Sequence, residues 1–103
     1  MTEKLNQAVF ADNLNTTFLL NLEGLGPIEL QLSKVSDINR SYGTEAFSIV
    51  FRGPGKAALS QRTYELQHET MGKFDIMLVP IGHDEQGVEY EAVFNRLIEE
   101  TNR

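Results

Sequence analysis

The chain has 103 residues, no cysteine and a formal net charge of −6. This length is enough for one hydrophobic core and too short for two, so residues 1–103 are predicted to form a single domain. The acidic balance argues against a nucleic-acid partner and against an anionic membrane surface, because both attract basic patches. The absence of cysteine excludes a disulfide framework, a thiolate zinc site and a cysteine nucleophile.

The start of the chain, Met-Thr-Glu-Lys-Leu, lacks the basic region and the apolar core of a secretory signal peptide. No apolar stretch approaches the roughly 20 residues that span a bilayer. We therefore expect no membrane insertion, and a location that is cytoplasmic or is reached by export without a cleaved signal peptide.

A short helix is predicted over residues 5–14. Its four apolar residues are spaced so that they fall on roughly one side of a helix, and they are Leu5, Val9, Phe10 and Leu14. We expect Leu5, Val9 and Phe10 to pack against a sheet, where the helix would plug one end of a barrel or sandwich.

Six runs of alternating apolar and polar residues follow, and they predict strands with one buried face and one exposed face. A break in the alternation near Ser33 and Lys34 predicts a β-bulge in the second strand. Pro80 predicts an edge or a bulge in the fifth strand, because proline cannot donate to a ladder. The predicted strands cover residues 17–23, 28–35, 46–52, 62–69, 73–81 and 88–95.

The segments between these runs are predicted to be turns and loops. Glycines in residues 24–27 and 69–72 permit positive φ angles and predict two tight hairpin turns. Residues 36–45 and 82–87 are polar and are predicted to be loops, the first of them long and mobile. A weak helical pattern over residues 96–103 predicts a short, fraying C-terminal helix.

Together, the strands and turns predict a mainly β domain. Six antiparallel strands in a meander are expected to close into a small barrel or to fold into a two-layer sandwich. An open sheet would leave edges that pair with other chains. We therefore expect closure, a helical cover, or a homo-oligomer that forms through strand edges.

Two histidines are the first candidates for chemistry. His68 has inward parity on its strand, where it could be a buried base, a metal ligand or a structural residue that hydrogen-bonds beside the turn. His83 lies with Asp84 and Glu85 in a predicted loop. Such side chains can bind metals, but neighbours on one loop rarely converge on one ion, so no metal or cofactor is predicted. The serines lack a nucleophile-elbow motif, and no enzymatic activity is expected.

Surface contacts are the remaining candidates. Residues 51–56 combine glycines with Arg52 and Lys56, but they lack the spacing of a phosphate-binding loop. Tyr42 is an aromatic residue in the polar 36–45 segment, and exposed tyrosines are frequent at interfaces. We predict four partner-binding residues, which are Tyr42, Arg52, His83 and Asp84.

Several stretches of the chain resemble a known family when they are read together. They are Ala46–Pro54, Leu59–His68, Leu78–Gly82 and Tyr90–Asn95, and Phe10 and Thr16–Phe18 also fit. Their order and spacing are similar to those of a small bacterial family labelled only as domain of unknown function 6916. The resemblance covers nearly the whole chain and implies no activity, substrate or catalytic residue. It implies an accessory or assembly role, associated with a phage-tail-like or fibrous surface structure.

These observations favour a non-enzymatic module that binds another protein and helps an assembly to form. An alternative is a small barrel that holds a small molecule at one mouth through Arg52 and His68, although six strands leave little interior room. A third interpretation, of another class, is a small enzyme that uses His68 with a carboxylate.

Overall fold

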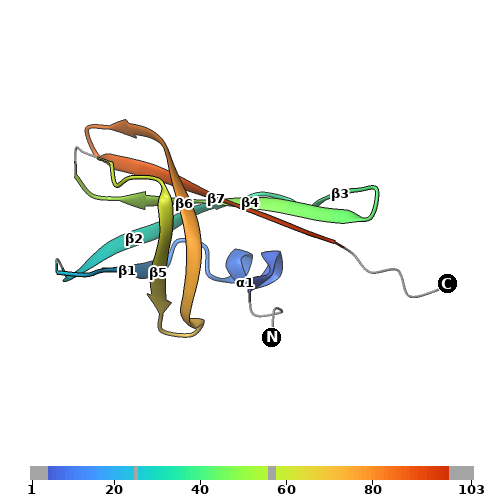
Figure 1. Ribbon diagram of the computed structural model, residues 1–103, viewed down its shortest axis with the longest axis horizontal. Coiled ribbons are helices and arrows are strands. Elements are labelled where there is room, and N and C mark those ends of the chain that lie inside the picture. Colours follow the sequence, from blue (N-terminus) through green and yellow to red (C-terminus); the bar gives the residue numbers. More distant parts are fainter. Residues whose placement is uncertain (1–4, 25, 56–57, 98–103) are drawn as a thin grey trace.

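The computed structural model describes residues 5–24, 26–55 and 58–97, and these ranges form one short helix and seven strands (Figure 1). None of the helical structure in these ranges is long and apolar enough to cross a membrane. The elements are α1 (Gln7–Asp12), β1 (Thr17–Leu22), β2 (Gly26–Val35), β3 (Asn39–Ser41), β4 (Thr44–Gly53), β5 (Arg62–His68), β6 (Gly72–Asp84) and β7 (Gly87–Leu97).

Helix α1 confirms the predicted N-terminal helix. Asn6 caps it, because its side-chain oxygen accepts a hydrogen bond from the Val9 backbone N–H at 2.9 Å and so satisfies one amide of the first turn. Phe10 is completely buried, and Leu5 and Val9 pack against the core. Leu14 lies beyond the end of the helix and is exposed.

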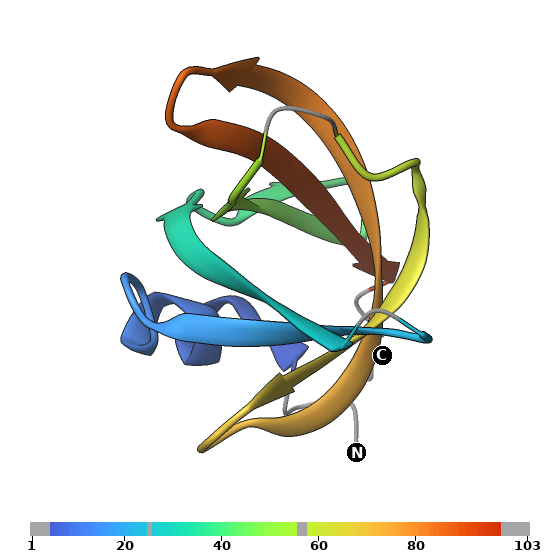
Figure 2. The same ribbon diagram turned by 90° about the vertical axis from the view of Figure 1, so that its left-hand side faces the viewer.

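Six of the strands close into an antiparallel barrel (Figure 2). Around its wall the order is β1, β2, β4, β7, β6 and β5, and β5 pairs with β1 to complete the circle. The prediction of a mainly β antiparallel domain is confirmed, and the structure forms the barrel rather than the sandwich.

The strand order departs from a simple meander in one place. β5 follows β4 in the sequence, yet β4 lies beside β7 and β5 lies beside β1. Both pairings join segments that are far apart in the chain. The alternation pattern identifies strands but carries no information about such neighbours.

Both predicted irregularities are present in the ladders. The register of β2 against β4 shifts between Leu32 and Lys34, where the bulge was predicted. The register of β6 against β7 shifts between Pro80 and Gly82. Gly72 has the positive φ of 79° that the preceding turn requires.

Two of the predicted loops are wrong in part. Within residues 36–45, Asn39–Ser41 form β3, which pairs with the start of β4 across a two-residue turn. Within residues 82–87, His83 and Asp84 continue β6 and pair with β7, so that only residues 85–86 form the turn. These strand segments are exposed along their whole length, so they show no apolar alternation.

The ends of two strands also differ from the prediction. β2 begins at Gly26, inside the turn predicted for residues 24–27, and β7 continues through Leu97. The predicted C-terminal helix is therefore wrong for residues 96–97. The rest of that prediction, residues 98–103, lies outside the described ranges.

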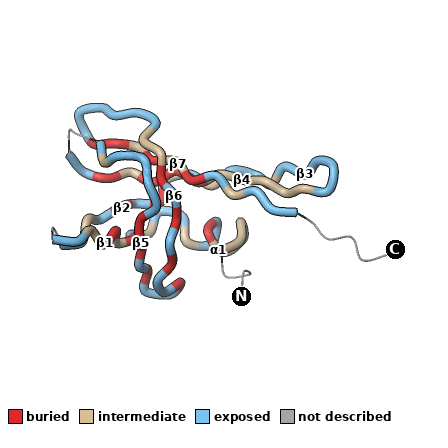
Figure 3. Tube along the Cα trace, viewed as in Figure 1, coloured by how far each residue is buried: buried red, intermediate tan, exposed pale blue. Residues whose placement is uncertain are grey.

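Inward-pointing side chains at alternate strand positions fill the barrel, as the buried positions of β5 and β6 show (Figure 3). Helix α1 covers the mouth at which β1 begins and from which β4 and β7 extend outward (Figure 1). Its Phe10 ring lies among four other phenylalanine rings, with centroid separations from 5.4 to 6.4 Å, and these are Phe18, Phe47, Phe74 and Phe94.

Candidate functional site

β4 and β7 continue past the end of the barrel and form a projecting three-stranded sheet with β3, which we call the arm (Figure 1). The arm comprises residues 38–48 and 92–97. The pairing of β4 with β7 runs out to Thr44 and Leu97, whereas β6 pairs with β7 only as far as Glu91. At about 3.3 Å per residue, the five β4 residues of the arm extend it by roughly 16 Å.

Tyr42 occupies the tip of the arm and is fully exposed. It forms the turn between β3 and β4 together with Gly43, and their φ angles are +49° and +80°. Two positive φ angles in a two-residue hairpin are typical of a type I′ turn, in which the first position favours asparagine, aspartate or glycine. The left-handed conformation costs an ordinary L-residue about 1–2 kcal/mol. Tyr42 therefore occupies a turn position that favours other residues.

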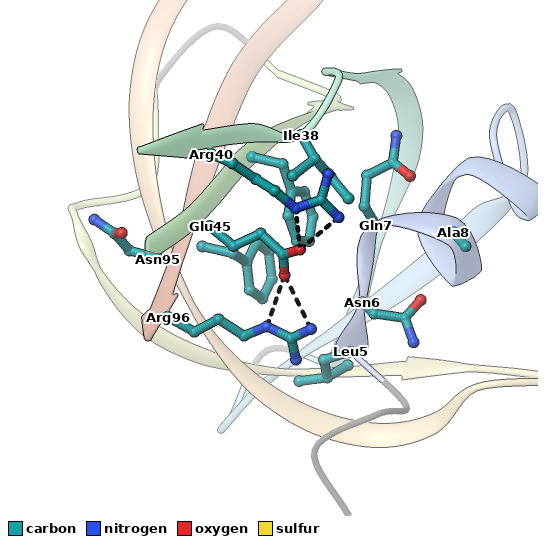
Figure 4. Close-up of a pocket in the computed structure, with 11 residues that line it drawn as sticks. Leu5, Asn6, Gln7, Ala8, Ile38, Arg40, Glu45, Asn95 and Arg96 are labelled. Atoms are coloured by element: carbon teal, nitrogen blue, oxygen red, sulfur yellow. Dashed lines mark hydrogen bonds and ion pairs between the residues drawn. The ribbon is translucent and has the colours of Figure 1, made fainter. Parts of the chain in front are cut away.

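Glu45 lies between two arginines on one face of the arm (Figure 4). Arg40 on β3 reaches its Oε2 with Nε at 3.1 Å and Nη2 at 2.9 Å. Arg96 on β7 reaches its Oε1 with Nε and Nη2, each at 3.0 Å. The Glu45 side chain is largely buried, while the side chains of Arg40 and Arg96 are more than half exposed. One side chain thus ties the three strands of the arm together.

The Glu45 cluster predicts a pH dependence. Hydrogen bonds from Arg96 and Arg40, opposed by desolvation, hold the pKa of Glu45 below its ordinary value of 4.5. A carboxyl whose pKa is lowered on folding stabilises the folded state above its unfolded pKa, and this stabilisation is lost as the pH falls through the folded pKa. We expect Glu45→Gln to unfold at lower urea concentration than the parent protein at neutral pH. The difference should shrink below pH 4.5, and a constant difference down to about pH 3 would contradict this account.

The base of the arm is braced against the barrel. Phe47 and Phe94 stack with their ring centroids 4.7 Å apart and their planes within 7°. Ser36 accepts a hydrogen bond from Gln7 of α1 through its carbonyl and forms two hydrogen bonds with Ser48 of β4. A hollow of about 340 Å³ remains between α1 and this face, and Figure 4 shows its lining.

Two predicted contact residues meet at the other end of β4. Arg52 Nη2 lies 2.7 Å from Asp84 Oδ1, and its Nη1 lies 2.9 Å from Glu89 Oε2. Asp84 also accepts a hydrogen bond from the Gln86 backbone N–H at 2.8 Å. The Gln86 bond, followed by that from Arg52, lowers the pKa of Asp84, while Asp84 raises that of Arg52. These contacts fix the β6–β7 hairpin to β4.

His83 is exposed next to this cluster, on β6 opposite Val88. Tyr42 is far from it, since ten residues of extended chain separate positions 42 and 52, or about 33 Å. The four predicted contact residues therefore lie in two separate regions of the surface, with Arg52, His83 and Asp84 in one and Tyr42 in the other. Arg52 and Asp84 form an ion pair with each other. The ring of Tyr42 at the tip stacks on no other aromatic ring among the described residues.

His68 is buried, and both of its ring nitrogens are used inside the protein. Its Nδ1 accepts hydrogen bonds from the backbone N–H groups of Thr70 and Met71, at 3.1 and 3.3 Å. Its Nε2 lies 2.9 Å from Thr16 Oγ1, which donates to the Asn13 carbonyl at 2.6 Å. Because that hydroxyl proton is already used, Nε2 must be the donor to Thr16. His68 is a structural link between the β5–β6 turn and the segment after α1.

The two residues of the ligand-binding alternative do not lie together. Arg52 lies on the outer wall with Glu89, whereas His68 points inward against Phe18, at 4.3 Å between ring centroids. A hollow of about 210 Å³ lies at the mouth opposite α1, and neither Arg52 nor His68 lines it. Among the described residues, no three histidine, aspartate or glutamate side chains form a group that could hold a metal ion.

The sequence analysis did not predict the arm, nor the contacts of Glu45 and Phe47 that order it. One signal was available, because Arg40 and Glu45 stand at matching distances on either side of Tyr42–Gly43, as opposite charges do across a hairpin. Arg96 gives no such signal. It lies 51 residues from Glu45 in the chain, and the long-range pairing of β4 with β7 brings the two together.

The chain belongs to the family described as domain of unknown function (DUF6916), whose sequence model matches residues 5–94. The family prediction is therefore confirmed. The matched range contains α1, the strands β1 to β6, and β7 as far as Phe94. A search of curated proteins and a search of solved structures each found no match.

Proposed function

We propose that the protein is a non-enzymatic interaction module that helps an assembly to form, and that the arm contacts the partner with Tyr42 at its tip. The observation that carries this proposal is a fully exposed tyrosine held in a left-handed turn at the end of a projecting sheet. Backbone strain of this kind is concentrated at functional positions in proteins.

The contacts that hold the arm in place support the same function. A contact residue binds more tightly when its support is ordered beforehand, because less conformational entropy is lost on association. The cluster of Glu45 with two arginines orders the outer half of the arm, and the stack of Phe47 on Phe94 orders its base. Tyrosine also has only two side-chain torsions and combines an apolar ring with a polar hydroxyl, which suits it to an interface.

The charge of the arm indicates the chemistry of the partner. Its three charged residues are Arg40, Glu45 and Arg96, so it has a net charge of +1 on a chain of net charge −6. The two arginine side chains are the exposed members of this set. A fitting partner has an apolar pocket for Tyr42 with acidic side chains or carbonyl oxygens beside it. That this partner belongs to a phage-tail-like or fibrous structure is the part of the proposal that the family resemblance supports.

The variant Tyr42→Asn is expected to change partner binding and folding stability in opposite directions. Asparagine is favoured at this turn position, so we expect the variant to gain about 0.5–1 kcal/mol of stability, or roughly 2–8 °C in Tm. We expect the same variant to recover at least tenfold less of the partner when tagged protein is used for affinity capture from its host. Thr63→Asn, at an exposed position on β5, is the matched control and should capture as the parent does. Undiminished capture by Tyr42→Asn would remove the tip from the interface.

A further inference from the structure

The outer edge of β7 in the arm has no strand beside it in the described part of the chain. β4 pairs with one side of β7 along its whole length, but β6 leaves the other side after Glu91. Residues 92–97 therefore present an edge that pairs with none of the described strands. Proteins usually protect such edges with proline, lysine, a bulge or a very short strand. The sequence Ala-Val-Phe-Asn-Arg-Leu contains no proline, lysine or acidic residue, and its six residues follow β4 without a register shift.

We infer that this edge pairs with the same edge of a second copy of the chain, antiparallel and centred on Asn95. The pattern of the edge is self-complementary about that residue. A two-fold axis at Asn95 places Val93 of each copy opposite Leu97 of the other copy, so the contact contains two such pairs. These two side chains are 64% and 81% exposed in the single chain, and both lie on the outer face of the arm. The pairing covers both of them.

The charges of the edge permit this pairing. Phe94 stands opposite Arg96 of the second copy on the other face, where a guanidinium can lie against an aromatic ring. The two Asn95 side chains meet at the axis, and amides can hydrogen-bond to each other. No pair of like charges stands opposite within residues 93–97. Two acidic chains of net charge −6 can therefore approach at an edge that has no acidic side chain of its own.

The contact is small for a protein–protein interface. Five or six paired residues on each strand form a contact at or below the roughly 1,200 Å² that stable complexes bury. The dimer is therefore a reversible one, and it populates in the micromolar range or above. It joins two arms into one six-stranded sheet that displays two Tyr42 tips. This inference is independent of the proposed function, because the edge does not include the tip.

Cysteine trapping tests the inference and its register, because the natural chain has no cysteine. In Asn95→Cys the two thiols face each other across the axis, so mild oxidation should give a covalent dimer. In Val93→Cys the two copies of residue 93 are offset by four residues, or about 13 Å along the strands, which is too far for a disulfide. We expect Asn95→Cys to cross-link at least tenfold faster than Val93→Cys. Equal rates, or no cross-link from Asn95→Cys, would overturn the inference.

Sedimentation of the parent protein over a range of concentrations gives the second readout. We expect a monomer–dimer equilibrium whose Kd rises at least tenfold in Val93→Lys, since a charge would be placed against Leu97 of the second copy. Ile81→Lys is the matched control, because Ile81 is a half-exposed apolar residue at the bulge of β6 opposite Glu89 and Tyr90, and not along residues 92–97. Tyr42→Asn should leave the dimer unchanged, which separates this inference from the proposed function. A parent protein that stays monomeric at millimolar concentration would contradict the dimer.

Discussion

Phe10→Ala is expected to lower the free energy of unfolding by about 3–5 kcal/mol, the range for truncating a buried phenylalanine. Phe10 is completely buried and lies within 6.4 Å, between ring centroids, of four other phenylalanines. Removing its ring leaves a cavity that all four neighbours border. Because those neighbours come from four different strands, they cannot close the cavity by moving one element.

Urea unfolding followed by circular dichroism measures this loss. Leu14→Ala is the matched control, since Leu14 lies just beyond the same helix and is 40% exposed. It should cost less than about 1 kcal/mol. A loss of that size for Phe10→Ala as well would show that α1 does not plug the barrel. The arm would then lose its support from α1, and with it part of the argument for an ordered tip.

Gly87→Ala is expected to have the second large effect, a loss of more than about 3 kcal/mol or failure to fold. A β-carbon at this position would overlap the backbone carbonyl oxygen of Gly53 on the neighbouring strand. The φ angle of Gly87 is +149°, which residues with a side chain rarely adopt. Backbone on both sides of the clash leaves no flexible side chain that could move away. The glycine therefore permits β4 and β7 to approach closely at the barrel end of their pairing.

Gly82→Ala, in the same hairpin, controls for the loss of a glycine. A β-carbon at Gly82 would meet no atom within 4 Å, so the variant should stay within about 1 kcal/mol of the parent. Soluble yield and urea unfolding of the two variants provide the comparison. Equal stability of Gly87→Ala and Gly82→Ala would show that the described contact of β7 with β4 is wrong at this end.

The alternation of apolar and polar residues predicted the strands that have one buried face, because burial of every second side chain requires an apolar residue at that position. It also predicted the bulge in β2. β3 left no trace, since Asn39, Arg40 and Ser41 are all exposed. The end of β6 at His83 and Asp84 was missed for the same reason. A strand that buries neither face is polar, and a polar strand cannot be told from a loop by its periodicity.

The candidate site was predicted less well than the fold. Tyr42 was found as an exposed aromatic residue, but the arm that carries it depends on which strands are neighbours. The register of β4 against β7 decides that Glu45 meets Arg96 and that Phe47 meets Phe94. It also leaves residues 92–97 with one edge that no strand within residues 5–24, 26–55 or 58–97 pairs with. These are long-range relations, and no local pattern of the chain encodes them.

The charge of the arm differs from that of the whole chain. The chain has a net charge of −6, whereas the arm has two exposed arginines around one largely buried glutamate. Screening limits each charge to a distance of about 8–10 Å in physiological salt. A partner at the tip therefore responds to the arm and not to the distant acidic residues of the barrel.

Site-specific photo-cross-linking is the measurement that tests the central claim most directly. A photoreactive aromatic amino acid placed at Tyr42 keeps the ring at the tip, and the same group at Thr63, on β5, serves as the control. Illumination in the native host, followed by mass spectrometry, identifies whatever the tip touches. Our account predicts one dominant protein cross-linked from position 42 and not from position 63. Equal labelling from both positions, or none from position 42, would contradict the assignment of the arm as the contact surface.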